Sequence, residues 1–156
     1  MKKIAMITLA VVLLLPLLVI GCKPEETTTP SVPPLNGGQK AVTIEITTDE
    51  FMANKNITKN VELVPPGSLI VTLGSNKTTG YQWGENAVNS NPAIIEQEAH
   101  SYVEPTGTGV VGAPGKEVWV FNSLKAGTAT IIMSYSRPFD ATTKDTWTLT
   151  LNVTVK

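Results

Sequence analysis

Few side chains in this 156-residue sequence could carry out chemistry, and they do not cluster. His100 is the single histidine, Cys22 is the single cysteine, and no pair of carboxylates stands out in an apolar context. A hydrolase or an oxidoreductase needs a base, a nucleophile, a metal cluster or a cofactor loop. We therefore expect no catalytic residue, no metal and no cofactor, and we interpret His100, close to Glu98, Ser101 and Glu104, as an exposed or rim residue.

Metal and phosphate sites are disfavoured by spacing as well as by composition. One histidine without a second soft ligand does not make a transition-metal site, and the scattered acidic residues lack the spacing of a calcium loop. The glycines of 107–109 and 112–115 suggest a phosphate loop, but neither segment leads into a helix that begins with Lys-Ser or Lys-Thr. The sequence therefore argues against both a metal site and a phosphate loop.

Unusual residues gather instead in three connections, of which the first is 75–81. It is rich in small hydroxyl side chains and contains Gly80, where glycine can adopt a positive φ that would strain other residues. Two large aromatic residues, Tyr81 and Trp83, follow at once. We interpret them as the root of the loop, where packing would limit its motion. Core packing at the start of a strand is the alternative.

The second connection, 104–115, surrounds the apolar pair Val110 and Val111 with glycine and proline. Its last residues suit a type II turn, with proline at the second position and Gly115 at the third. We expect the two valines to make apolar contact along a groove of a partner. A mobile hairpin without such contact is the alternative.

The third connection, 137–144, begins with Arg137-Pro138-Phe139. A planar donor and an apolar ring beside a rigid proline form the composition of an interface hot spot. A salt bridge with packing at the end of a strand is the alternative interpretation of this tripeptide.

A series of short strands must position these connections. Alternating apolar and polar residues predict strands almost throughout 41–156, most strictly in 145–155, and no long helix. Seven or so strands at short intervals imply an all-β fold, an immunoglobulin-like antiparallel sandwich without the cysteine pair of antibody domains. For 94–102 a short helical turn is the alternative. The predicted strands are 41–47, 68–74, 94–102, 116–121, 128–136 and 145–155.

Residues 1–21 have the pattern of a secretory signal peptide. Two lysines precede an apolar run without charge, and Gly21 before Cys22 resembles a bacterial lipobox. That resemblance implies cleavage before Cys22 and a lipid on its sulfur. We therefore expect an exported chain, anchored by lipid to a bacterial membrane at the cell envelope or surface. An uncleaved transmembrane helix is the alternative, although Pro16 interrupts the run.

We predict that residues 22–40 form a flexible tether and that residues 41–156 form a single domain. The tether is rich in Pro, Thr and Gly and nearly free of large apolar residues, so burial cannot offset the entropy of ordering it. Acidic residues outnumber basic ones, 13 against 12, and removal of the signal peptide widens that excess. Nucleic acid is therefore not an expected partner. A lone cysteine forms no internal disulfide, so the core must hold the fold, and we expect a monomer.

Taken in order, the three connections resemble those of the chagasin-like inhibitors of papain-type cysteine peptidases. The family motif Asn-Pro-Thr-Thr-Gly-Tyr/Phe-x-Trp is similar to 76–83, with Lys77 in place of proline. Its Gly-x-Gly-Gly is similar to 112–115, with Pro114 in place of glycine, and its Arg-Pro-Trp to 137–139, with Phe139 in place of tryptophan. The residues that we assign to peptidase binding are Asn76, Lys77, Thr78, Thr79, Gly80, Tyr81, Trp83, Val110, Val111, Gly112, Ala113, Pro114, Gly115, Arg137, Pro138 and Phe139.

The resemblance covers roughly 41–156 and implies a reversible proteinaceous inhibitor with an immunoglobulin-like fold. In the family the first loop enters the peptidase cleft near the catalytic Cys-His pair, and the other two loops brace either side. Thr78, Thr79 and Gly80 would then place backbone and hydroxyl groups beside the nucleophile without presenting a scissile bond.

Two other classes of function remain as alternatives. The same scaffold would serve a cell-surface lipoprotein that binds or adheres without inhibiting a peptidase. A cell-envelope enzyme that depends on His100 is the third class.

Overall fold

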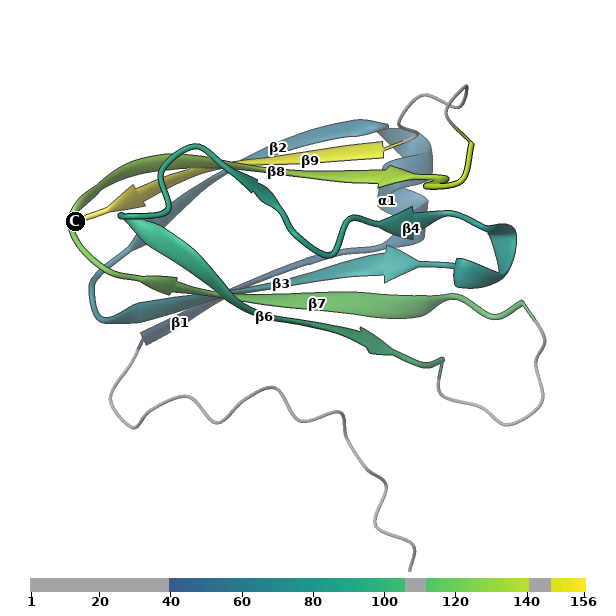
Figure 1. Ribbon diagram of the computed structural model, residues 1–156, viewed down its shortest axis with the longest axis horizontal. Helices are drawn as coiled ribbons and strands as arrows, with labels where there is room; N and C mark the ends of the chain where they lie inside the picture. Colours follow the sequence, from purple (N-terminus) through teal and green to yellow (C-terminus); the bar gives the residue numbers. More distant parts are fainter. Residues whose placement is uncertain (1–39, 106–111, 141–146) are drawn as a thin grey trace, which may run out of the picture.

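The computed structural model describes residues 40–105, 112–140 and 147–156. Within these ranges the chain forms two β-sheets packed as a sandwich, with one short α-helix and one 3-10 turn (Figure 1). The predicted signal peptide, Cys22 and almost all of the predicted tether lie outside the described residues. In the described part of the chain, no helix is long and apolar enough to cross a membrane.

The first sheet has the strand order β1-β3-β7-β6. Its members are β1 (Lys40–Ile46), β3 (Gly67–Ser75), β7 (Gly115–Ser123) and β6 (Ile95–Val103). The second sheet has the order β2-β9-β8-β4, with β5 also paired to β8. Its members are β2 (Asn56–Leu63), β9 (Trp147–Val155), β8 (Gly127–Ser136), β4 (Gln82–Trp83) and β5 (Val88–Asn89).

The all-β sandwich predicted from the sequence is confirmed, and every strand that was predicted is present. Residues 94–102 form a strand, β6, rather than a helical turn. Two pairings differ from a wholly antiparallel sandwich, because β1 pairs with β3 and β2 with β9 in parallel. The chain leaves β1 for β2 in the other sheet and then returns to β3, and two reversals of direction make β1 and β3 parallel.

The core lies between the inner faces of the two sheets. Strand β9 alternates as predicted, with Leu149, Leu151, Val153 and Val155 all buried. Strand β7 does not alternate, because it lies in the middle of its sheet between β3 and β6 and is buried on nearly every residue. The alternation expected for 116–121 is therefore wrong.

The short helix α1 (Thr48–Ala53) connects the two sheets and was not predicted. Thr47 caps its first turn, and the side chains and backbones of Thr47 and Glu50 bond reciprocally as a capping box. The helix buries Phe51, which is 0% exposed, against Trp83 and Trp147 at ring-centroid distances of 4.9 and 5.4 Å. Packing of this one ring, rather than helix length, therefore holds α1 in place.

Candidate functional site

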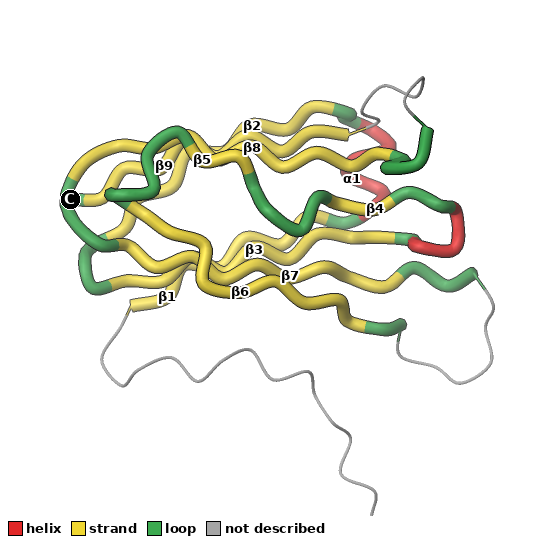
Figure 2. Tube along the Cα trace, viewed as in Figure 1, coloured by secondary structure: helices red, strands yellow, loops and turns green. Residues whose placement is uncertain are grey.

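Three connections meet at the end of the sandwich that lies away from the C-terminus (Figure 2). We call this region the loop end. Its first loop is 76–81 between β3 and β4, its second is the described part of the β6–β7 connection, 104–105 and 112–114, and its third is 137–140 after β8. Helix α1 lies at the same end. The fold therefore brings together in space the three connections that have an unusual composition.

The first loop is a 3-10 turn, Lys77–Thr79, that is closed by its own side chains. The Asn76 amide oxygen accepts from the Thr78 backbone N–H at 3.2 Å and from the Thr78 hydroxyl at 2.6 Å. The Thr79 hydroxyl donates to the Asn76 carbonyl at 2.6 Å. Both threonine hydroxyls thus donate to acceptors within the loop. The turn is therefore already formed before a partner binds.

Gly80 ends this turn with a φ of 79°, so the positive φ predicted at this position is confirmed. A Cβ atom added there would meet only the Arg137 Nε, at 3.9 Å, which is an ordinary contact. Glycine is therefore required at position 80 by backbone conformation and not by lack of space.

Contacts from both neighbours hold the first loop. The Asn76 side-chain N–H donates to the carbonyl of Gly112 in the second loop at 3.0 Å. From the third loop, Arg137 donates to the Thr79 carbonyl at 3.2 Å, and its guanidinium lies 4.5 Å above the Tyr81 ring. The three loops therefore form one connected surface instead of three independent arms.

Lys77, which stands where the resembling family has proline, also contributes a contact. Its Nζ lies 4.1 Å above the ring of Tyr102 on β6, within the range of a cation–π interaction. Burial raises the pKa of the Tyr102 phenol, and the nearby charge of Glu104 adds to that rise. The phenol therefore stays neutral over the ordinary pH range while its ring face attracts the lysine.

The second loop differs from the type II turn predicted from the sequence. Positive φ occurs at Gly112, at 87°, and not at Gly115. Gly115 begins β7, and a Cβ atom there would lie 2.5 Å from the carbonyl oxygen of Val103 on β6. Glycine is thus needed at 115 for the close approach of two strands. The remaining assigned residues of this loop, Val110 and Val111, lie outside the described residues.

The third loop presents two side chains in opposite ways. Arg137 turns back onto the first loop, whereas the side chain of Phe139 is 100% exposed. The backbone carbonyl of Arg137 accepts from the Asp140 N–H at 3.2 Å, and this bond closes the turn that contains Phe139. Residues 141–144, the rest of the predicted third connection, lie outside the described residues.

The two aromatic residues after the first loop have separate positions. Trp83 is 0% exposed in the core, with its ring 5.2 Å from that of Tyr135, whereas Tyr81 is partly exposed and stacks on Tyr135 at 5.7 Å. The Tyr135 hydroxyl in turn accepts from the Asn76 backbone N–H at 3.1 Å. Core packing and support of the loop are therefore performed by the same rings.

A hollow of about 500 Å³ opens beside the first loop, between that loop and α1. The rings of Tyr81, Tyr135 and Trp147 line it together with Met52 of α1, which is 65% exposed. The lining residues are Thr48, Asp49, Met52, Asn76, Thr79, Tyr81, Pro114, Tyr135 and Trp147.

His100 was expected to be an exposed or rim residue, and it is half-buried on β6, the edge strand of its sheet. Its side chain is 15% exposed, its ring packs 4.7 Å from that of Trp119, and its Nε2 lies 2.9 Å from Glu117 Oε2. Glu117 itself is 1% exposed and was missed. Its burial could have been predicted from its position in the strand, because Glu117 lies on the same strand face as Trp119 and Phe121. Among the described residues, no group of three acidic, histidine or cysteine side chains could hold a metal ion.

Comparison with known proteins finds matches to this chain in sequence and in fold. Residues 66–153 match the family model described as Chagasin family peptidase inhibitor I42. Amoebiasin-2 of Entamoeba histolytica is 29% identical over 86 residues, which are 55% of this chain and 68% of that protein.

Two solved structures have the same fold. The cysteine protease inhibitor EhICP2 from Entamoeba histolytica superposes with a TM-score of 0.57 at 24% identity, over 76% of this chain and 100% of that one. PbICP-C, solved in complex with falcipain-2, superposes with a TM-score of 0.55 at 20% identity, over 75% of this chain and 99% of that one.

Proposed function

Because the chain belongs to the chagasin family of peptidase inhibitors, we propose that it reversibly inhibits papain-family cysteine peptidases by blocking the active-site cleft with its three loops, 75–81, 104–115 and 137–144. The observation that carries the proposal is the connected loop end, in which Asn76 and Arg137 join the first loop to the other two. The relation to PbICP-C, which was solved with falcipain-2, supports a peptidase as the partner.

The first loop has the properties that an uncleaved plug needs. Its backbone is a helical turn, in which the Thr79 and Gly80 N–H groups donate to the Asn76 and Lys77 carbonyls, both at 3.1 Å. A peptide bond that is held in such a turn does not lie extended for attack by a nucleophile. Since the turn is closed before binding, little conformational entropy is lost when it enters a cleft.

The flanking loops supply contact on either side of this plug. Phe139 offers a fully exposed ring, which loses contact with water when a partner covers it. Arg137 is held by Thr79 and Tyr81 and therefore needs little further ordering on binding. In the second loop, the Gly112 carbonyl accepts from Asn76, with Ala113 and Pro114 following Gly112 and Val110 and Val111 preceding it in the sequence.

The proposal extends to location. Residues 1–21 would be removed as a signal peptide, and Cys22 would carry the lipid that anchors the chain to a bacterial membrane. The tether of 22–40 would then leave the loop end free to reach a peptidase outside the cytoplasm. The chain would act as a monomer, without cofactor and without turnover.

Inhibition of papain tests the proposal. The domain from Lys40 to Lys156 is titrated against papain at several substrate concentrations, and the inhibitor is recovered and weighed by mass spectrometry. We expect reversible inhibition that is competitive with substrate, and an intact chain at the end. A domain that is folded by circular dichroism but does not slow papain or cathepsin L would favour the binding lipoprotein instead.

A further inference from the structure

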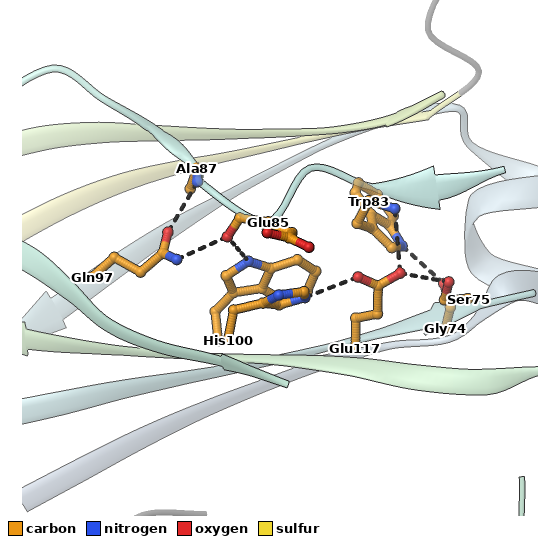
Figure 3. Close-up of polar contacts among 9 residues, drawn as sticks. Gly74, Ser75, Trp83, Glu85, Ala87, Gln97, His100 and Glu117 are labelled. Carbon is orange, nitrogen blue, oxygen red and sulfur yellow. Dashed lines mark hydrogen bonds and ion pairs between the residues drawn. The ribbon is translucent and has the colours of Figure 1, made fainter. Parts of the chain in front are cut away.

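A buried carboxylate, Glu117, bonds to the residues on either side of the first loop, Ser75 and Trp83 (Figure 3). Glu117 sits on β7, 1% exposed, in the inner part of the sandwich. Glutamate is almost never buried to this degree unless it is paired, because taking a carboxylate out of water is costly. Its contacts therefore indicate what it does there.

One oxygen of Glu117 holds both ends of the first loop. Oε1 accepts from the Ser75 hydroxyl at 2.7 Å and from the Trp83 backbone N–H at 3.3 Å. Ser75 is the last residue of β3 and Trp83 the last of β4, so the two donors flank 76–82. The Trp83 indole N–H closes the same neck by donating to the carbonyl of Gly74 at 3.0 Å.

The other oxygen of Glu117 is held by His100. Its Oε2 lies 2.9 Å from His100 Nε2, a hydrogen-bond distance at which an ionised Glu117 accepts from the Nε2–H tautomer of the imidazole. The imidazole is fixed in turn against Trp119, whose indole N–H donates to the Glu85 carbonyl at 3.1 Å. Among the described residues, no buried side-chain nitrogen or oxygen lacks a hydrogen-bond partner.

Core stability alone does not explain this arrangement. Replacement of a whole buried ionic pair by apolar side chains of similar volume is often neutral or stabilising, so an apolar pair at positions 100 and 117 would serve the core as well as His100 and Glu117. A leucine would not bond to Ser75 and Trp83 at the same time. The carboxylate does so, and it thereby sets the distance across which the loop must close.

We propose that Glu117, oriented by His100, is a positioning residue for the first loop: its bonds to Ser75 and Trp83 fix the shape of 76–81 that a peptidase meets. This inference rests on the proposed function. It assigns no chemical step to Glu117 or His100, which act only through the loop.

Ser75→Ala tests the inference against a matched control, Ser123→Ala. Ser123 is also a buried serine of the first sheet, and its hydroxyl bonds to the Gly67 backbone at 2.9 Å at the opposite end. We expect Ser75→Ala to raise the inhibition constant for papain roughly tenfold, mainly through faster dissociation, as follows from loss of one buried hydrogen bond. Ser123→Ala should lower the melting temperature about as much as Ser75→Ala does, and its inhibition constant should stay within about twofold of that of the original chain. Equal inhibition constants for the two variants would overturn the inference.

Amide hydrogen exchange of residues 76–82 separates this inference from the proposed function, because it needs no peptidase. Ser75→Ala should accelerate exchange within these residues, and Ser123→Ala should not, whether or not papain is inhibited. Unchanged exchange in Ser75→Ala would reject the positioning role by itself.

A pair of substitutions at Glu117 provides the rescue. Glu117→Gln keeps an oxygen for Ser75 and Trp83, but its amide nitrogen would face His100 and force the imidazole hydrogen from Nε2 to Nδ1, a change visible in imidazole nitrogen NMR shifts. Its inhibition constant should stay within about threefold of the original, whereas Glu117→Leu should weaken inhibition at least as much as Ser75→Ala. A folded Glu117→Leu variant that inhibits like the original chain would contradict the inference.

Discussion

A Trp83→Ala variant is expected to lose about 3 to 5 kcal/mol of unfolding free energy, because the indole is fully buried and the neighbouring rings cannot collapse into the space that it leaves. Its ring lies 4.9 Å from Phe51, 5.2 Å from Tyr135 and 6.4 Å from Trp119. Denaturant unfolding followed by circular dichroism measures the loss. Inhibition should weaken together with stability, since Tyr135 also supports the first loop through its bond to Asn76.

Trp83→Phe is the control for this prediction. It keeps an apolar ring in the core and removes only the outer part of the indole and its bond to Gly74. We expect a smaller loss of unfolding free energy than for alanine. If the free energy of unfolding of Trp83→Ala lies within about 1 kcal/mol of that of the original chain, the described packing at the root of the loop is wrong.

Replacing Thr79 by glutamate should act in the opposite way, with a large effect on inhibition and a small one on stability. Thr79 is exposed, so the free energy of unfolding should change by about 1 kcal/mol or less. A carboxylate at the tip of the turn would have to leave water in the peptidase cleft without a partner, which costs several kcal/mol. We therefore expect the inhibition constant to rise roughly a hundredfold or more. Thr78→Glu should behave similarly.

Two controls separate charge from position. Thr79→Ser keeps the hydroxyl that bonds to the Asn76 carbonyl and should inhibit nearly as well as the original chain. Thr128→Glu adds the same charge at an exposed threonine at the start of β8, far from the loop end, and should not change inhibition. Parallel losses of inhibition in Thr79→Glu and Thr128→Glu would indicate that net charge, and not the loop, decides binding.

The strands could be predicted wherever one face is buried and the other is exposed to solvent. In β9 the apolar residues recur at every second position, and the structure buries the residues that this pattern selects. In β2 the pattern fails, because Lys59 occupies the inward-facing position between Ile57 and Val61, and that strand was missed. Helix α1 is too short to show a period, although the Thr47–Glu50 capping box that starts it is visible in the sequence.

The loop end could be predicted from motif order, but not its internal bonds. Asn76, Thr79 and Arg137 are recognisable as loop residues, whereas the bonds that join them depend on contacts between positions 58 residues apart for Arg137 and Thr79. Gly115 illustrates the same limit, since its neighbour Val103 on β6 is what excludes a side chain there. Such contacts depend on sheet pairing, which local sequence does not encode.

Binding to cleft-filled papain is the measurement that tests the central claim most directly. Papain is compared before and after its catalytic cysteine has reacted with a covalent peptide-like inhibitor that occupies the cleft, and association with the immobilised chain is measured by surface plasmon resonance. Since the three loops are proposed to enter the cleft, we expect binding to free papain and none to the filled enzyme at the same concentration. Equal binding to both forms would contradict the account, because the loop end would then contact the peptidase elsewhere.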